Sequence, residues 1–169
     1  MFLDGMALTF TSALTWIPLY AVLLYLVIKN NESMGQICLI ICCALACYFL
    51  SFQGANPMAV AMFFCLLVRN SLLNFFLFAW ALIHGGFQMY SRGNEPMDIA
   101  FGLLWGIVLG IAVYCLFKKI YYKFNPKLNY VSSQYTSTGY SHDDINIVIT
   151  VMVAVCLYAV IGGMVRSTV

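Results

Sequence analysis

The stretch IAFGLLWGIVLGIAVYCLF, at residues 99–117, contains no charged side chain and has charged residues on both sides. A helix that crosses a bilayer needs roughly 20 apolar residues, so this stretch alone predicts a membrane span. Gly102, Gly106 and Gly110 recur at every fourth position within it. Such small residues let two helices approach closely in lipid. We expect this glycine face to pack on another helix of the same chain; contact between two protomers is the alternative.

The composition of the whole chain extends this prediction beyond one helix. Hydrophobic residues make up 63% of the sequence and charged residues 8%, against roughly 25% charged residues in soluble domains. A soluble chain of this length exposes too much surface to hide so much apolar area. We therefore predict an all-α, polytopic membrane helical bundle surrounded by membrane lipids. The formal net charge of +2 is too small to indicate a nucleic-acid partner.

Charged and helix-breaking residues divide the chain into six predicted spans within a single membrane domain, residues 1–169. The predicted spans are 6–28, 34–50, 53–68, 72–85, 99–117 and 145–165. Gln-Gly-Ala-Asn-Pro at 53–57 separates the second run from the third, because Gly and Pro stop a helix. Arg69 is placed in a turn, since a mid-bilayer position would cost about 2.5–3.5 kcal/mol. The first run lacks the features of a cleaved signal peptide and is expected to remain as a span.

Lys and Arg are distributed unevenly between the two sides of this topology. One side carries Lys29, Arg69, Lys118, Lys119, Lys123 and Lys127, and the other carries Arg92 and Arg166. The positive-inside rule places the six-cation side in the cytoplasm and both termini outside, which in the bacterial inner membrane means the periplasm. Residues 118–144 are the predicted interfacial cytoplasmic loop, whose Lys- and Tyr-rich start at 118–124 suits anionic lipid. Asp143 and Asp144 suit the N-terminus of the last span.

Side chains for catalysis or metal binding are scarce. The seven cysteines lie in apolar runs without a nearby His or carboxylate, so we expect them to pack as small hydrophobic residues. Four of them fall in one predicted span, at Cys38, Cys42, Cys43 and Cys47. His84 and His142 fall on opposite sides of the predicted membrane, so the spacing indicates no Ser-His-acid or Cys-His pair. We expect neither a metal nor a cofactor.

Polar residues gather on the predicted outer side. Gln53 and Asn56 lie between the second and third spans. The connection between the fourth and fifth spans carries His84, Gln88, Arg92, Asn94, Glu95 and Asp98. Both connections open to the same side, so we expect them to line one shallow outward cleft. The alternative is that they are polar only because loops face water.

A resemblance to one family of membrane enzymes begins in this region. YSRGNEPMDIAFGLLWG at residues 90–106 resembles the third motif and following helix of the type-2 phosphatidic acid phosphatases, which remove phosphate from lipid phosphates and diphosphates. TWIPLY at 15–20 is similar to the first span of bacterial members, and Arg69-Asn70 and LFAW at 77–80 resemble their turn and fourth span. The resemblance covers most of residues 4–119 and rests mainly on scaffold positions.

The same resemblance shows which reactive groups are missing. In the family a His nucleophile, oriented by an Asp, takes the phosphoryl group, and a second His protonates the leaving group. The matching positions here hold Gln53, Gln88, Asn94 and Asp98, so only the Asp is retained, and the family's first motif, a Lys followed by Arg-Pro, is absent. Amides are neither basic nor nucleophilic, but they can hydrogen-bond a head group. The resemblance therefore implies a catalytically inactive relative.

Three functions follow as hypotheses. In the first, the chain binds a lipid or polyprenyl phosphate head group at its outer face, through Gln53, Asn56, His84, Gln88, Arg92 and Asn94. In the second, it is a structural or assembly subunit that holds a partner membrane protein. In the third, it is an active lipid phosphatase that uses His84 with Asp98.

Overall fold

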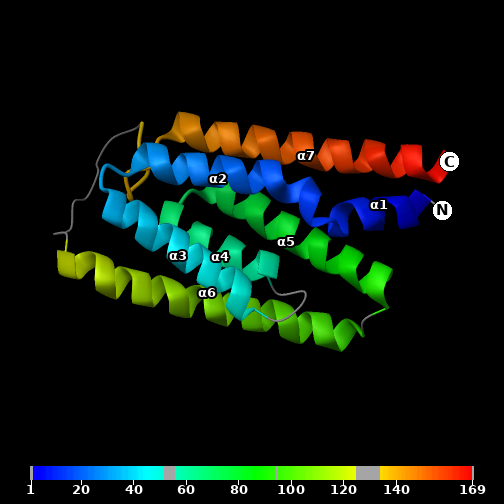
Figure 1. The fold of residues 1–169 in the computed structure, drawn as a ribbon, viewed down its shortest axis with the longest axis horizontal. Helices are drawn as coiled ribbons and strands as arrows, with labels where there is room; N and C mark the ends of the chain where they lie inside the picture. Colours follow the sequence, from blue (N-terminus) through cyan, green and yellow to red (C-terminus); the bar gives the residue numbers. More distant parts are fainter. Residues whose placement is uncertain (1, 52–55, 94, 125–133, 169) are drawn as a thin grey trace.

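The computed structural model describes residues 2–51, 56–93, 95–124 and 134–168. In chain order the elements are α1 (Phe2–Thr11), the 3-10 helix η1 (Ala13–Trp16), α2 (Ile17–Asn30), α3 (Met34–Leu50), α4 (Asn56–Val68), α5 (Ser71–Arg92), α6 (Pro96–Phe124) and α7 (His142–Thr168). Over the described ranges the only β feature is an isolated bridge between Tyr135 and Ser141. The helices lie along one long axis (Figure 1). The all-α prediction is confirmed.

The connections between helices gather at the two ends of this bundle. One end holds the α2–α3 turn, the α4–α5 turn, the end of α6 and the start of α7 (Figure 1). We call it the basic end, because the helix termini there carry Lys29, Arg69, Lys118, Lys119 and Lys123. The opposite end holds both chain termini and the α5–α6 connection. The cations that the sequence assigns to one side therefore lie at one end, except Lys127, which is outside the described residues.

Three helices are long and apolar enough to cross a membrane, namely Ser71–Ser91, Pro96–Lys123 and His142–Val165. The bent pair α1 and α2 makes a fourth if it counts as one span. Met34–Leu50 and Pro57–Val68 are apolar but shorter. At about 1.5 Å per residue, both fall short of the roughly 30 Å hydrocarbon core. Helices of this length and apolarity are those of an integral membrane protein.

Two helices continue past their predicted ends. The fourth predicted span ended at residue 85, but α5 reaches Arg92. Its two adjacent glycines lower helix propensity, yet Gly85 packs against α6, 3.6 Å from Ile99 as measured from an ideal Cβ. The predicted cytoplasmic loop began at residue 118, but α6 continues to Phe124, with Tyr121 packed against the core. Charge ends an apolar run without ending a helix, because Lys stems lie along the helix while their ammonium groups reach water.

The break between α1 and α2 is the main departure from a straight span. The two segments meet at 67°, and carbonyl groups near the break lose their helical donors. Side chains replace those donors: the Thr15 hydroxyl donates to the Thr9 carbonyl at 2.7 Å, and the Trp16 indole N–H donates to the Phe10 carbonyl at 2.7 Å. Backbone groups at membrane depth must be paired inside the protein. These two bonds therefore make the bend tolerable.

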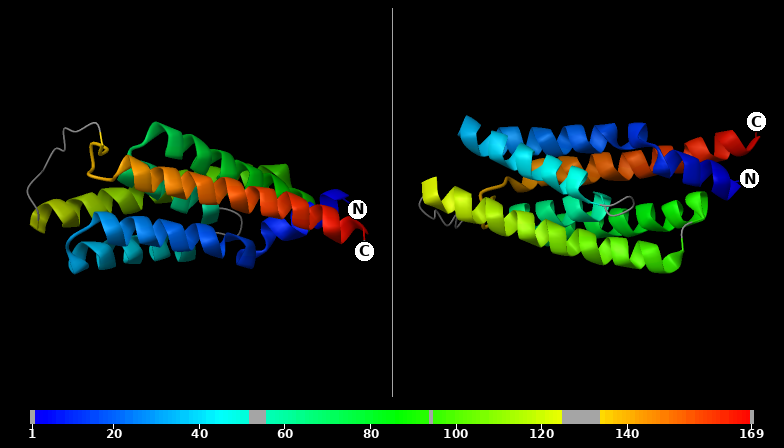
Figure 2. Two further views of the ribbon diagram at one scale, coloured as in Figure 1. Left: turned by 90° about the horizontal axis from the view of Figure 1, so that it is seen from above. Right: turned by 60° about the horizontal axis from the view of Figure 1, so that its bottom comes forward.

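The core of the bundle surrounds α4, which contacts α3, α5 and α6. Most of its side chains from Met58 to Val68 are buried. Gly110 of α6 faces it: a Cβ at this position would lie 2.8 Å from the Ala59 carbonyl oxygen and 2.8 Å from the Met62 Cβ. At Gly110 the glycine face therefore packs inside the chain. On the other side of the bundle α7 lies along α1 and α2 (Figure 2).

Candidate functional site

Only some of the polar residues predicted to line the outer cleft are among the residues that the structure describes. His84 and Gln88 lie one turn apart on α5, and both are buried, at 7% and 8% exposed. Asp98 is exposed in the first turn of α6. Gln53, Asn94 and the side chains of Asn56 and Arg92 lie outside the described residues. Contrary to the expected shallow surface cleft, His84 and Gln88 point into the bundle rather than lining a loop.

Aromatic rings surround His84 on that inner side. Its imidazole centroid lies 6.2 Å from the Trp16 ring and 6.3 Å from the Trp80 ring. The two indoles meet edge to face at 5.3 Å, and Phe10 stacks on Phe87 at 4.7 Å. We call Phe10, Trp16, Trp80, His84 and Phe87 the aromatic cluster. It forms because the α1–α2 break brings Phe10 and Trp16 against the side of α5 that carries Trp80 and His84.

Two buried polar groups beside this cluster lack partners. The Gln88 Oε1 and the Trp80 Nε1 make no hydrogen bond with any described part of the chain. A buried polar group without a partner costs about 1–3 kcal/mol. The two atoms are complementary, because the indole N–H is a donor and the amide oxygen an acceptor. Such groups mark the place where a polar ligand or an ordered water is most readily accommodated.

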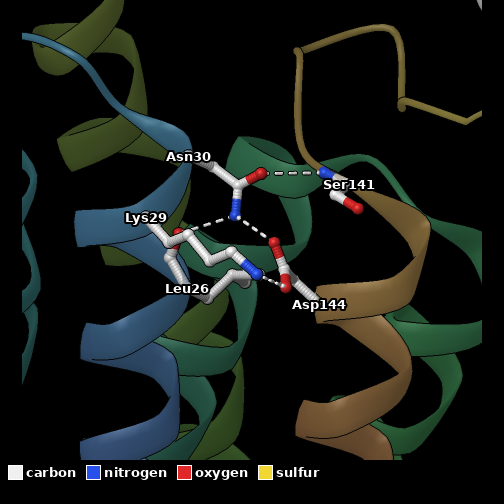
Figure 3. Close-up of polar contacts among 5 residues, drawn as sticks. All are labelled: Leu26, Lys29, Asn30, Ser141 and Asp144. Atoms are coloured by element: carbon white, nitrogen blue, oxygen red, sulfur yellow. Dashed lines mark hydrogen bonds and ion pairs between the residues drawn. The ribbon is translucent and has the colours of Figure 1, made fainter.

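The basic end differs, because its polar side chains bond one another. The Lys29 Nζ lies 2.6 Å from the Asp144 Oδ1, and the Asn30 Nδ2 donates to the Asp144 Oδ2 at 3.1 Å (Figure 3). The Asn30 Oδ1 in turn accepts from the Ser141 backbone N–H at 2.9 Å. Asp144 is 3% exposed, whereas the Lys29 side chain is 51% exposed. The carboxylate is thus fixed at the start of α7 by groups from the end of α2.

The segment before α7 joins this network. The Asn31 Nδ2 donates to the Tyr140 hydroxyl at 3.3 Å, and the Thr138 hydroxyl donates to the Val68 carbonyl at 2.9 Å. Burial raises the pKa of Tyr140 to about 12, so its phenol stays neutral at physiological pH. Asn70, the N-cap of α5, also lies 3.2 Å from the His142 Nδ1. Residues 134–144 are therefore pinned to α2, α4 and α5.

Two pockets open at the basic end. One, of about 880 Å³, is lined by Asn70, Ser71 and His142 together with the segment 135–137. The other, of about 810 Å³, lies between the α2–α3 turn, the end of α6 and the segment 135–141. Arg69 lines both. Sequence reasoning missed these pockets: it placed the cations on one side but had no signal for the cavities between helix ends.

Among the described residues, no three His, Cys, Asp or Glu side chains come together as a metal site requires. Cys47 and Cys65 are buried, and Cys38, Cys42 and Cys115 are exposed on helix faces. His84 lies in the aromatic cluster, whereas His142 starts α7 at the basic end. Comparisons of the chain with protein-family models, curated proteins and solved structures find no match. The resemblance to the type-2 phosphatidic acid phosphatases therefore stays a prediction.

Proposed function

We propose that the chain is a non-enzymatic membrane protein that binds the head group of a lipid or polyprenyl phosphate beside the aromatic cluster. The observation that carries this proposal is the buried amide oxygen of Gln88, which has no hydrogen-bond partner among the described residues. The resemblance aligns Gln88 with the Arg of the Ser-Arg pair that opens the family's third motif, and in that family Lys and Arg side chains bind the phosphate. An amide can donate to a phosphate oxygen and accept from a hydroxyl, but it is neither a base nor a nucleophile.

The surroundings of Gln88 fit a head group attached to a lipid tail. Trp80 supplies an indole N–H without a partner in the described ranges, and the neighbouring rings provide apolar walls. Aromatic side chains with one polar atom are favoured where apolar and polar matter meet. The break between α1 and α2 lies against the same cluster, and interrupted membrane helices often border binding sites.

The proposal includes six spans. The bent pair α1–α2 forms the first, and α3 to α7 form the other five, with α3 and α4 as short spans next to longer helices. The basic end then faces the cytoplasm and the opposite end the periplasm of a bacterial inner membrane. The grouping of Lys29, Arg69 and Lys118 at one end supports this orientation, by the positive-inside rule. Alkaline phosphatase fused to the C-terminus would be active if the proposal holds and inactive if the bundle is inverted.

The positions of the remaining titratable groups support binding without phosphatase chemistry. His84 packs among Trp16 and Trp80 on the α1–α2 side of α5. Asp98 is exposed in the first turn of α6. Phosphoryl transfer to a His requires an imidazole that reaches the phosphorus and a group that orients it. His84 is buried among aromatic rings and Asp98 is exposed, so the two side chains are in different surroundings.

Lipid retention tests the binding site directly. Detergent-purified protein is analysed by native mass spectrometry with added phosphatidic acid and undecaprenyl phosphate. We expect the Gln88→Leu variant to retain fewer lipid molecules per chain than the wild type, and the neighbouring exposed-position variant Met89→Leu to retain the same number. Equal retention by both variants would rule out Gln88 as a ligand.

Phosphate release tests the absence of chemistry. The wild-type chain should release no phosphate from the same lipids above the protein-free blank. Release that disappears in an Asp98→Ala variant would establish the active-phosphatase alternative instead. A membrane protein that co-purifies in fixed proportion, in place of lipid, would favour the assembly-subunit alternative.

A further inference from the structure

The 810 Å³ pocket at the basic end has an apolar floor and a polar rim. Ile40, Leu67 and Phe117 form the floor. The rim carries the exposed cations Arg69 and Lys118 and the exposed carboxylate of Glu32, while the Asp144 carboxylate in the lining is bound to Lys29. The tyrosines that line the pocket are Tyr114, Tyr121, Tyr122, Tyr135 and Tyr140. Tyrosine is enriched where a membrane protein meets the interface between lipid and water.

The cations that line this pocket differ in whether they already interact with other side chains of the protein. Lys29 is bound to Asp144 at 2.6 Å. Lys118 lies over the Tyr122 ring, 5.7 Å from its centroid. The Arg69 side chain makes no hydrogen bond or ion pair with the described part of the chain, although its backbone N–H donates to the Cys65 carbonyl at 3.1 Å. Its guanidinium is thus available to a phosphate, which it can bind through two parallel hydrogen bonds.

The backbone of Arg69 is itself unusual. Its φ of 54° lies in the left-handed region. Among the described residues, Arg69 is the only non-glycine residue with a positive φ. For a residue with a side chain, this backbone conformation costs roughly 1–2 kcal/mol. When a helix ends on a left-handed residue, that residue is usually Gly or Asn. A residue held in an unfavourable conformation can indicate a functional constraint. Here the strained residue is the cation that lines both basic-end pockets.

We propose that the pocket binds the phosphate of an anionic membrane lipid, with Arg69 as the principal ligand and Lys118 as the second. A lipid fits better than a free phosphate, because the floor is apolar and tyrosines of the kind found at membrane interfaces line the pocket. The site lies at the end of the bundle away from Gln88, so it does not depend on the function proposed above. The proposal differs from a general attraction of surface lysines to anionic lipid, because it assigns the phosphate to one residue, Arg69, whose backbone is strained.

The experiment measures lipid binding to the full chain by native mass spectrometry, with phosphatidylglycerol and phosphatidylcholine as probes. Arg69→Gly should weaken phosphatidylglycerol binding about tenfold, as expected for a charge-assisted, bidentate contact, and should leave phosphatidylcholine binding unchanged. The same substitution should raise the thermal midpoint of the lipid-free protein, since it removes the strain. Impaired folding therefore cannot account for the loss of binding.

A matched pair of lysines separates the pocket from general surface charge. Lys118→Ala should weaken phosphatidylglycerol binding, whereas Lys119→Ala, at an exposed position that does not line the pocket, should not. Equal losses would overturn the proposal in favour of unspecific attraction. Competition by inorganic phosphate at low millimolar concentration would overturn the lipid assignment. Gln88→Leu should leave this binding unchanged, which keeps the two sites distinguishable.

Discussion

The two ends of the bundle differ in the balance of their interactions: the basic end has a network of polar bonds, whereas the opposite end combines close packing with one such bond, from the Tyr90 hydroxyl to Asp4 at 2.9 Å. At the basic end, Asp144 accepts from Lys29 and Asn30, and side chains of α2, α5 and α7 bond one another. At the opposite end the contact between α1 and α7 is close packing: a Cβ on Gly163 would lie 2.9 Å from both the N and the Cα of Met6. Polar bonding suits the end that meets charged head groups and water, whereas close backbone approach suits helices in lipid.

The same contrast separates the two proposed sites. Polar groups at the basic end are mostly satisfied within the protein, whereas the Arg69 guanidinium makes no hydrogen bond or ion pair in the described part of the chain. Around the aromatic cluster, Gln88 and Trp80 leave buried polar atoms without partners in the described ranges. A buried polar group that is hydrogen-bonded stabilises the fold. One without a partner destabilises it unless a ligand or a water molecule supplies the missing hydrogen bond. Removing a bonded polar group such as Asp144 should therefore lower stability, whereas replacing Gln88 should raise it.

The largest effect is expected at the packed end. Gly163→Ala should lower the free energy of unfolding by about 3 kcal/mol, since overpacking costs about 1–3 kcal/mol and the added methyl would meet the backbone N and Cα of Met6 as well as its Cγ. Gly162→Ala is the matched control, because its Cβ would lie 3.6 Å from the Thr9 methyl, in ordinary contact. The measurement is unfolding in mixed detergent micelles. Similar stability of the two variants would show that α1 and α7 do not pack this closely.

The next effect lies in the polar network. Asp144→Ala should destabilise the protein by about 2 kcal/mol, the usual effect of losing hydrogen bonds to a charged group. The half-exposed Lys29 can turn toward water, which limits the loss. Asp143→Ala removes an exposed carboxylate from the same helical turn and should lose only the helix-dipole contribution, about 0.3–1 kcal/mol. Equal losses would mean that the contacts to Lys29 and Asn30 do not contribute.

The sequence predicts the helices well where charge and apolar runs coincide. The predicted span at 34–50 coincides with α3, because uncharged residues fill it from end to end. The sequence also predicts that Lys29, Arg69 and Lys118 share one side of the protein. In the structure the helix termini that carry them lie at one end of the bundle. The α1–α2 break was missed: it depends on Thr15 and Trp16 side chains that satisfy carbonyl groups, which no hydrophobic pattern records.

The candidate sites were less predictable for a similar reason. The sequence predicts Gln88 in the connection after a span that ends at residue 85, but α5 continues to Arg92, with Gly85 packed against α6. Asp144 was expected to favour a helix N-terminus, and it does lie in the first turn of α7. Its pairing with Lys29, 115 residues away, depends on how the helices assemble. Neither local sequence nor periodicity contains that information.

A smaller change of opposite sign is expected at Gln88. Gln88→Leu should stabilise the lipid-free protein by about 1 kcal/mol, because it replaces a buried amide, whose oxygen has no partner in the described ranges, with an apolar group of similar size. Met89→Leu, at the exposed neighbouring position, should be close to neutral. Unfolding of delipidated protein is the measurement, since a bound head group would complete the amide and hide the gain. A loss as large as that of Asp144→Ala would show that Gln88 is bonded within the protein.

The smallest effect tests whether the helix beside the aromatic cluster is optimised for stability. Gly86 is exposed on α5, and a Cβ there would meet nothing within 4 Å. Gly86→Ala should therefore stabilise the protein by roughly 0.5 kcal/mol, through helix propensity and reduced freedom of the unfolded chain. It adds no contact, so lipid retention should not change if the cluster is preformed. A slower exchange of bound lipid, measured by native mass spectrometry after mixing with labelled lipid, would instead show that α5 bends at Gly86 to admit the ligand.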